Sequence, residues 1–500
     1  MPAAQPANPR VFRFIVMASL GVAAFFMLAT THADPDLWGH LRFGSDILQH
    51  MRLDSADPYS FTSDRPWINH EWLSEVAIAA TWMHAGSSGL IALKLAIVAA
   101  TMWLVIHTLA VRGVGRGARL LLGGLALVGI LPRTLYVRPQ LFSLLLFAAL
   151  VHVLTHAEGG RRRWLALCPV ILALWVNFHG GWIAGLGSLV VWALADAWSR
   201  RGKGVRALDA LAWTGVSTAA TLLNPYGTGL WDFLLETVRP GREAIGEWGP
   251  AWNEPAVLIV WLLLGWLGAA SAARKGSSRD VRRYVLPVLW CAASLMVVRL
   301  DAFFALSVVG FLGSEIEAFL GRTREHRSLP VVARAAIVAT VLCLAVSFPA
   351  ARSALTCVPV QADEWPEPDS VEFIHLNDLS GRMLTYFNWG QYAIWHVPPA
   401  VKVSMDGRRE TVYSDAMISG HLRFYAAKEE GVSFAEGLRA DYVWLPVGSP
   451  AAAALKGRGW STAFEGERSM ILLSPDRTPE EPFVQPASGG PAATRCFPGP

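Results

Sequence analysis

Two acidic residues follow the first apolar stretch of the chain. Asp34 and Asp36 flank Pro35, and His40 stands one helical turn after Asp36. A carboxylate in this position can act as a general base on an acceptor hydroxyl or can bind a metal ion. Helix capping alone would explain Asp34, and the helix dipole also favours Asp36. Neither requires both acids together with an imidazole on the same face, so Asp36 is the stronger catalytic candidate.

A second polar motif lies at 67–72, where Asn69, His70 and Glu71 stand between two tryptophans. Asn69 as a helix cap, with the tryptophans as membrane-interface anchors, explains the motif equally well. Adjacent His70 and Glu71 do not share a helical face, so the spacing does not predict a zinc site.

Three arginines stand where the chain turns between apolar stretches, which is a costly place for charge. They are Arg133, Arg138 and Arg299. The guanidinium fork binds phosphate in a bidentate manner, so we expect these residues to bind a phosphate group. Snorkelling to lipid phosphates is the alternative for all three.

Further polar groups stand at the ends of apolar stretches on the side of these arginines. Asn177 and His179 precede Gly180-Gly181, and Asn224 precedes Pro225. We expect them to line the same pocket as Asp36, Arg138 and Arg299. Asn224-Pro225 could instead serve only to end a helix.

The composition indicates that a membrane must position these groups. Of 500 residues, 53% are hydrophobic and 16% are charged, whereas a soluble domain carries about 25% charged residues. The fold class expected is mainly α, a polytopic bundle of transmembrane helices. Membrane orientation accounts for the net charge of +4, and we expect no nucleic-acid partner.

Apolar segments of spanning length predict about eleven membrane helices. We expect them at 11–31, 89–111, 117–133, 135–157, 163–178, 181–199, 206–223, 254–273, 282–298, 300–320 and 329–350. The first segment could be a cleaved signal peptide, but its length favours an uncleaved span. The segment 72–85 is too short to span, so we place it at the outer leaflet.

Basic linkers alternate with the linkers that carry the candidate site. By the positive-inside rule the basic linkers lie in the cytoplasm, and so does the N-terminus. The candidate residues and everything after 351 should then lie outside the cytoplasm. The basic linkers contain Arg112, Arg116 and Arg119; Arg161–Arg163; Arg200, Arg201, Lys203 and Arg206; Arg274, Lys275, Arg279, Arg282 and Arg283; and Arg322, Arg324 and Arg327.

The chain divides into two domains and a tail. We expect a transmembrane domain at 1–355, with an external loop at 32–71 and juxtamembrane helices, and a soluble extracytoplasmic α/β domain at 363–475. Residues 476–500 are rich in Pro, Gly and Ala and are expected to be disordered. Within the soluble domain we expect strands at 383–386, 392–396, 401–404, 441–445 and 469–473, and helices at 415–428 and 433–439. Cys357 and Cys496 would both be external and could pair.

Taken together, these motifs resemble the membrane-embedded glycosyltransferases of the GT-C fold, in particular a bacterial group of undefined substrate. The motifs that carry the resemblance are Asp34-Pro35-Asp36-Leu37-Trp38-Gly39-His40, Asn69-His70-Glu71-Trp72, Arg138-Pro139-Gln140, Asn177-Phe178-His179-Gly180, Asn224-Pro225-Tyr226-Gly227, Phe387-Asn388-Trp389-Gly390-Gln391-Tyr392 and Asp406-Gly407-Arg408. Asn388 and Trp389 depart from the Trp-Trp-Asp-Tyr-Gly motif of oligosaccharyltransferases, so recognition of a peptide sequon is not implied.

The resemblance implies a multi-pass protein of the bacterial cytoplasmic membrane that takes a sugar from a polyprenyl-phosphate lipid and inverts the anomeric centre. The acceptor would be a glycan, a lipid or a protein of the cell envelope. Asp36 would be the base, with Arg138 and Arg299 at the donor phosphate. Some such enzymes use a divalent metal, which this sequence leaves open. A flippase, ligase or transporter of lipid-linked glycan, or a non-catalytic scaffold, are the alternatives.

Overall fold

The computed structural model describes residues 21, 25, 28–202, 208–237, 248–274, 279–321, 354–479, 481–487 and 496–499. The chain forms two compact units, and each is built from segments that are far apart in sequence. The first unit contains 1–31, 88–227 and 239–357, and the second contains 32–87, 228–238 and 358–500. The segment 32–87 therefore packs with the C-terminal part of the chain.

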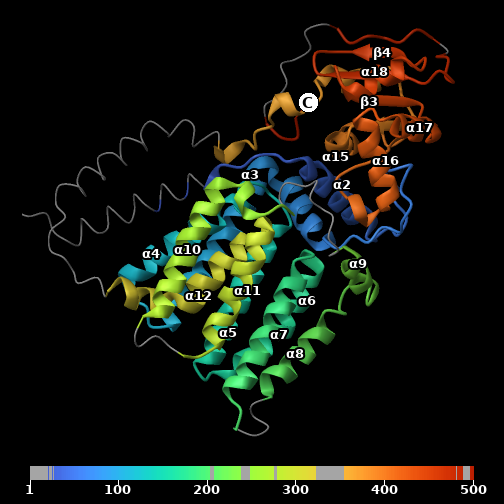
Figure 1. Ribbon diagram of the computed structural model, residues 1–500. Coiled ribbons are helices and arrows are strands. Elements are labelled where there is room, and N and C mark those ends of the chain that lie inside the picture. Colours follow the sequence, from blue (N-terminus) through green and yellow to red (C-terminus); the bar gives the residue numbers. More distant parts are fainter. Residues whose placement is uncertain are drawn as a thin grey trace, which may run out of the picture. The chain divides into compact units, whose positions relative to one another are not determined.

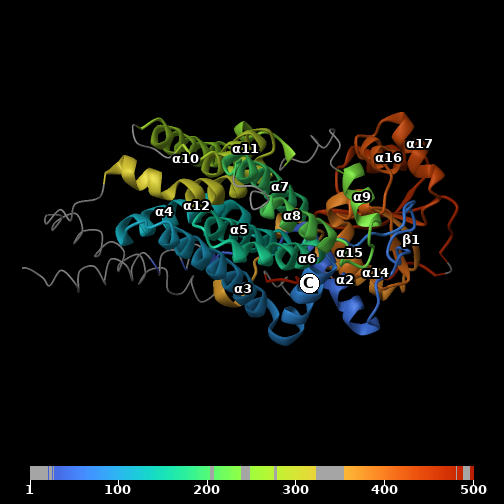
Figure 2. The same cartoon turned by 90° about the horizontal axis from the view of Figure 1, so that it is seen from below.

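The first unit is helical (Figure 1). Its helices are the second half of α3 (Trp72–Val111), then α4 (Arg116–Ile130), α5 (Gln140–Glu158), α6 (Cys168–Phe178), α7 (Trp182–Ser199), α8 (Asp209–Ala220), α10 (Pro255–Ala273), α11 (Arg282–Met296) and α12 (Asp301–Leu320). Helix α12 is almost wholly buried and packs against α4, α5, α10 and α11, as both views show (Figures 1 and 2). Small residues permit this contact, because a methyl group on Gly129 or Gly310 would overlap a neighbouring helix.

Six described helices are long and apolar enough to cross a membrane. They are Trp72–Val111, Arg116–Thr134, Gln140–Glu158, Trp182–Ser199, Pro255–Ala273 and Val298–Leu320. The protein is thus a multi-pass membrane protein. The expected span at 329–350, and all of that at 11–31 except residues 21, 25 and 28–31, lie outside the described residues.

Three predicted spans correspond to helices shorter than expected, namely α6, α8 and α11. They have 11, 12 and 15 residues and rise by about 16–23 Å, less than the bilayer core of about 30 Å. Helix α6 is short because its first turns are the 3-10 helix Arg162–Leu167, and α11 contains Pro287.

Helix α3 contains a break at Gly86, whose φ of 53° is accessible to glycine at little cost. The break divides a helix of 40 residues into an N-terminal part and an apolar C-terminal part. This division coincides with the expected boundary between the segment 72–85 and the span at 89–111.

The second unit contains a five-stranded mixed sheet in the order β2-β1-β3-β5-β4. Strands β1, β2 and β3 are parallel, and β5 is antiparallel to both β3 and β4. The strands are β1 (Gly381–Thr385), β2 (Val401–Val403), β3 (Tyr442–Pro446), β4 (Ser461–Glu465) and β5 (Ser469–Leu473). The helices are α2 (Pro35–His50), the first half of α3, α9 (Gly229–Thr237), α14 (Pro368–Leu376), α15 (Gly390–His396), α16 (Asp415–Tyr425), α17 (Glu429–Gly437) and α18 (Pro450–Lys456).

One hydrophobic core joins the sheet to α16, α17 and α18. Phe424, Val432 and Leu455 from these helices pack against Val443 and Leu472 of the strands. The strands expected near 383–386, 401–404, 441–445 and 469–473 are present, whereas β4 was not expected.

The strand expected at 392–396 is wrong, because these residues belong to α15. Helical spacing stacks Tyr392 on His396, with ring centroids 4.2 Å apart. It also packs α15 against α2, where Gly39 leaves room for the Gln391 side chain.

The segment after α2 extends the sheet at β2. Ser60 forms a parallel bridge with Val403, whose amide donates to the Tyr59 carbonyl at 3.0 Å. At the other end of the chain, Val484 exchanges hydrogen bonds with the Asn377 side chain, and the Trp38 indole donates to the Pro498 carbonyl at 2.8 Å. These hydrogen bonds attach the described stretches 481–487 and 496–499 to the second unit.

Cys357 and Cys496 are both disulfide-bonded, whereas Cys168 and Cys291 are free thiols. A backbone bridge pairs Pro359 with Cys496. Disulfides form and persist in oxidising compartments and are rare in the cytosol.

Candidate functional site

Helix α2 presents the acidic motif as the sequence predicts. Asp34 is the N-cap, and its Oδ1 accepts a hydrogen bond from the Leu37 amide at 2.9 Å. Pro35 occupies the first helical turn, and Asp36 follows as its acidic residue. Asp34 is buried in this capping role, whereas Asp36 is half-buried. The cap gives Asp34 a structural role in α2, and a catalytic role for either acid remains a prediction.

Asp36 lies against the loop that carries the Asp406-Gly407-Arg408 motif. A methyl group on Gly407 would overlap the Asp36 carboxylate and press on the Gln391 amide. Glycine is therefore needed at 407 to admit the carboxylate. Both motifs, 34–36 and 406–408, can be recognised in the sequence, but nothing in the sequence indicates that they are in contact.

His40 lies between acids on α2 and α3. Its Nδ1 is 3.4 Å from Glu75 Oε1, and the Asn69 amide donates to Glu75 Oε2 at 2.5 Å. Burial lowers the pKa of His40, but the hydrogen bond to Glu75 and the charges of Glu71, Glu75 and Asp36 together raise it to about 9. His40 is therefore an imidazolium at neutral pH, with Asp36 among the carboxylates that stabilise its charge.

His70 and Glu71 form an adjacent pair, with His70 Nε2 3.4 Å from Glu71 Oε1. The His70 ring packs on Phe233 of α9. Burial lowers the pKa of His70, and the charge and hydrogen bond of Glu71 more than compensate and raise it. Asn69 Oδ1 accepts from the Glu71 amide at 3.2 Å, so Asn69 stabilises the turn into α3 as well as holding Glu75.

A buried arginine holds the 406–408 loop in place. The Arg408 guanidinium binds Asp57 through two hydrogen bonds of 2.7 and 2.9 Å, and binds Asp406 at 2.9 and 2.7 Å. The Tyr413 hydroxyl donates to Asp406 Oδ2 at 2.8 Å. The carbon at the centre of the guanidinium lies 4.9–5.2 Å from the ring centroids of Phe43, Tyr59 and Trp67. This network ties α2 and the segment after it to the sheet.

In the first unit, Arg133 and Asp301 form a buried ion pair. Arg133 Nε donates to Asp301 Oδ1 at 2.9 Å, and its Nη2 donates to the Val298 carbonyl at 3.1 Å. The side chains of both residues are 6% exposed. The pair joins the turn after α4 to the start of α12.

Arg138 and Arg299 each lie over an aromatic ring, at 5.0 Å from the Tyr136 centroid and 5.9 Å from the Trp248 centroid. Both arginines are half-buried. Stacking of this kind orients a guanidinium group.

His179 is oriented by groups from two helices and the turn between α6 and α7. The Gly181 amide donates to its Nδ1 at 3.0 Å, and Ser143 Oγ lies 2.7 Å from the same atom. Trp175 Nε1 donates to Ser143 Oγ at 2.7 Å, so the Ser143 hydroxyl proton is available for His179. Because a backbone N–H can only donate, Nδ1 is an acceptor and the neutral ring carries its proton on Nε2. Ser143 was not predicted from the sequence.

Asn177 and Asn224 have structural partners. The Asn177 amide donates to the carbonyls of Ala173 and Leu223, and joins α6 to the end of α8. Asn224 donates to the Thr221 and Gly227 carbonyls and accepts from the Tyr226 amide. These bonds support the helix-terminating explanation of Asn224.

Several basic residues of the linkers expected in the cytoplasm form ion pairs within the first unit. Arg162 and Arg282 both bind Asp196, which is fully buried, and Arg112 binds Glu158 at 2.8 Å. The side of the membrane on which these linkers lie remains a prediction.

A mainly apolar cavity of about 180 Å³ lies between α4, α10 and α12, with Asp301 and Trp261 on its wall. Within the described part of the chain, no group of three or more His, Cys, Asp or Glu residues could hold a metal ion.

The predicted site residues thus fall into two sets. Asp34, Asp36, His40, His70 and Glu71 belong to the second unit. Those of the first unit are Arg133, Arg138, Asn177, His179, Asn224 and Arg299. The expectation that both sets line one cavity remains a prediction.

No protein-family model matches the sequence, and no curated protein matches it significantly. Solved structures do resemble the fold. Oligosaccharyltransferase AglB from Archaeoglobus fulgidus, in complex with an inhibitory peptide and a dolichol-phosphate, has a TM-score of 0.57 and 11% identity, over 86% of this chain and 69% of AglB. ArnT from Cupriavidus metallidurans has a TM-score of 0.53 and 12% identity, over 93% of this chain and 98% of ArnT.

Arabinofuranosyltransferase AftD from Mycobacteria has a TM-score of 0.53 and 16% identity, over 92% of this chain and 40% of AftD. These proteins are GT-C glycosyltransferases. The chain therefore has a GT-C-like fold over most of its length, as the sequence motifs suggest.

Proposed function

We propose that this GT-C-like protein is a membrane glycosyltransferase, which moves a sugar from a polyprenyl-phosphate donor to an extracytoplasmic acceptor in bacterial cell-envelope assembly. The observation that carries the proposal is a half-buried carboxylate, Asp36, in the first turn of α2, in a chain with this fold. The dolichol-phosphate bound to AglB supports a lipid phosphate as the donor class.

Asp36 is the base in this proposal. It accepts the proton of the acceptor hydroxyl as that oxygen bonds to the anomeric carbon of the sugar. Gly407 leaves room for its carboxylate, and the His40 imidazolium stands one helical turn away on α2. Asp34, which caps α2, sets the direction of the helix start.

Arg138 and Arg299 bind the donor phosphate. The bond between the anomeric carbon and the phosphate oxygen breaks, and polyprenyl phosphate leaves with the electron pair. Because the acceptor oxygen attacks from the opposite face, the anomeric centre is inverted. Two oriented guanidinium groups stabilise the charge that grows on the phosphate. The Nε2–H group of His179 adds a neutral donor. Because Arg133 is paired with Asp301, we assign it to holding the turn that precedes Arg138.

The apolar cavity between α4, α10 and α12 suits the hydrocarbon chain of such a lipid. Membrane lipids would surround the remaining apolar helix faces.

The proposed orientation places the basic linkers in the cytoplasm. The disulfide-bonded Cys357 and Cys496 support an extracytoplasmic C-terminal domain, because cytosolic thiols are kept reduced.

The test is the Asp36→Asn variant of the full-length protein. It should lower sugar transfer about 100-fold or more, the usual contribution of a general base, while the melting temperature and the binding of polyprenyl phosphate stay unchanged. Asp54→Asn, in the loop after α2, is the matched control. Near-normal transfer by Asp36→Asn would refute the role of Asp36.

A further inference from the structure

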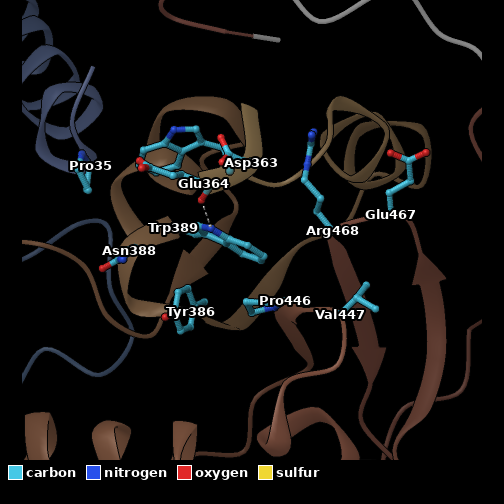
Figure 3. Close-up of a pocket in the computed structure, with 11 residues that line it drawn as sticks. Pro35, Asp363, Glu364, Tyr386, Asn388, Trp389, Pro446, Val447, Glu467 and Arg468 are labelled. Atoms are coloured by element: carbon cyan, nitrogen blue, oxygen red, sulfur yellow. Dashed lines mark hydrogen bonds between the residues drawn. The ribbon is translucent and has the colours of Figure 1, made fainter. Parts of the chain in front are cut away.

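A pocket of about 450 Å³ opens on the second unit, beside the start of α2 (Figure 3). Its volume lies within the range of about 300–1,000 Å³ that is usual for small-molecule sites. It is bounded by the loop 363–365 and by the 3-10 helix Phe387–Trp389 before α15. The end of β3 at 446–447 and the residues 467–468 before β5 complete its wall. The Asn388-Trp389 motif thus lines a cavity.

The floor of the pocket is aromatic. Trp389 is buried, and its indole N–H donates to the Glu364 carbonyl at 3.1 Å (Figure 3). Tyr386 meets it edge-on, with ring centroids 5.5 Å apart. Trp365 is only 3% exposed and also contributes to the wall. Such rings accept the C–H face of a sugar, which is apolar on one side and hydroxylated at its edge.

The rim carries more acid than base. Asp363, Glu364 and Glu467 line the pocket, and Arg468 is the one basic residue among its lining residues (Figure 3). Carboxylates accept hydrogen bonds from hydroxyl and ammonium groups, and they repel phosphate and uronate groups. The rim therefore favours a ligand that is rich in hydroxyls and has no negative charge.

Two donors in the pocket wall lack acceptors. Within the described part of the chain, the indole N–H of Trp365 and Nε of Arg468 are buried and form no hydrogen bond. A buried N–H without a partner is costly and rare. Each needs an acceptor oxygen, and the hydroxyl oxygens of a sugar can provide one.

We propose that this pocket binds the acceptor, a glycan without negative charge, so that the protein discriminates against phosphorylated and uronate-bearing glycans. The acceptor role rests on the proposed function. It is supported by Pro35, which lines the pocket and stands next to the base Asp36 in the first turn of α2.

The experiment uses fluorescently labelled full-length protein in lipid nanodiscs on a glycan array with neutral, amino-bearing, uronate-bearing and phosphorylated glycans. The wild type should bind neutral or amino-bearing glycans at least tenfold better than anionic ones. A pocket variant removes three charges by Asp363→Asn, Glu364→Gln and Glu467→Gln. A control variant removes three surface charges of the same unit by Glu429→Gln, Glu436→Gln and Glu465→Gln. The pocket variant should lose the discrimination, and the control variant should keep it.

Trp365→Phe keeps an aromatic ring of smaller size and removes the unpaired N–H. It should weaken glycan binding about five- to tenfold, and the packing lost against Trp38 and Tyr392 should lower the melting temperature only slightly, so binding is compared at a temperature at which both proteins are folded. Anionic glycans bound as tightly as neutral ones, no glycan bound, or identical behaviour of the pocket and control variants would overturn the proposal.

Failure of the proposed function has a different signature. Asp36→Asn should retain glycan binding and lose transfer. A protein that binds neutral glycans through this pocket but never transfers a sugar would refute the glycosyltransferase and leave the glycan site in place.

Discussion

Replacement of Arg408 by glutamine should be one of the most destabilising changes in the second unit. The Arg408 side chain is 6% exposed, and the side chains of its partners Asp57 and Asp406 are fully buried. Arg408→Gln leaves two buried carboxylates without their cation, and breaking a buried pair costs about 3–5 kcal/mol. For a domain of about 150–250 residues this corresponds to a fall of about 6–20 °C in melting temperature.

Asp57→Asn should cost less, because Arg408 keeps its pair with Asp406. The expected loss is about 1–3 kcal/mol, the cost of hydrogen bonds to a buried charged group. The order of the two variants therefore tests whether the cation or one carboxylate dominates the network.

The pH dependence gives a second test with a definite sign. Burial raises the pKa of Asp406, but the charge and hydrogen bonds of Arg408 outweigh burial and leave that pKa below the usual 3.8. The contribution of Asp406 to stability is therefore fully present above pH 3.8 and is lost only as the pH falls through the lowered pKa. Between pH 5 and 8 the wild-type contribution is constant. In Arg408→Gln, Asp406 loses the cation that lowers its pKa, so burial should raise that pKa and this variant gains stability as the pH falls from 7 to 5.

The assay is thermal unfolding of the detergent-solubilised full-length protein at pH 5, 6, 7 and 8. Arg458→Gln is the control, because Arg458 forms exposed ion pairs on the same unit and should leave the melting temperature unchanged. A variant Arg408→Gln that is no less stable than Asp57→Asn, or that gains no stability between pH 7 and pH 5, would refute the role of Arg408 as the dominant member of the network.

Three further results are expected. Gly407→Ala should reduce sugar transfer at least tenfold by displacing the proposed base, whereas Gly437→Ala, where a methyl group meets open space, should not; equal activity of the two would contradict this. His40→Gln should lower the free energy of unfolding by about 3 kcal/mol at pH 6 and by less than about 1 kcal/mol at pH 9. The reason is that the His40 pKa of about 9 in the folded protein exceeds its value of 6.5 in the unfolded chain, so the stabilisation is lost as the pH rises through 9. Melting curves that differ from those of the wild type by the same amount at both pH values would disprove this. Cysteines introduced at Arg161 and Arg299 should react with a membrane-impermeant reagent from opposite faces of the membrane, and equal access from outside would overturn the orientation.

Local sequence patterns predicted most of the elements. The N-cap of α2, the position of the charged linkers and the hydrophobic strands β1, β3 and β5 each follow from a few neighbouring residues. The error at 392–396 also has a local origin, since a short aromatic and aliphatic run is compatible with strand or helix. Burial against α2 decides in favour of the helix.

The contacts that form the candidate site could be predicted only in part. Asp36 with Gly407, and Asp57 with Arg408, join residues that are more than 300 positions apart. No periodicity or spacing reports such a pairing in a single sequence. The contact of Ser143 with His179 could not be predicted either. A serine inside an apolar helix has no distinctive local pattern.

The most direct measurement reconstitutes the protein in proteoliposomes with a panel of polyprenyl-phosphate sugars and follows the release of free polyprenyl phosphate. If the protein is a glycosyltransferase, we expect polyprenyl phosphate to be released from at least one donor. This release should depend on an added acceptor and should be abolished by Asp36→Asn. Movement of intact donor across the bilayer, without any cleavage of the bond between sugar and phosphate, would contradict the account.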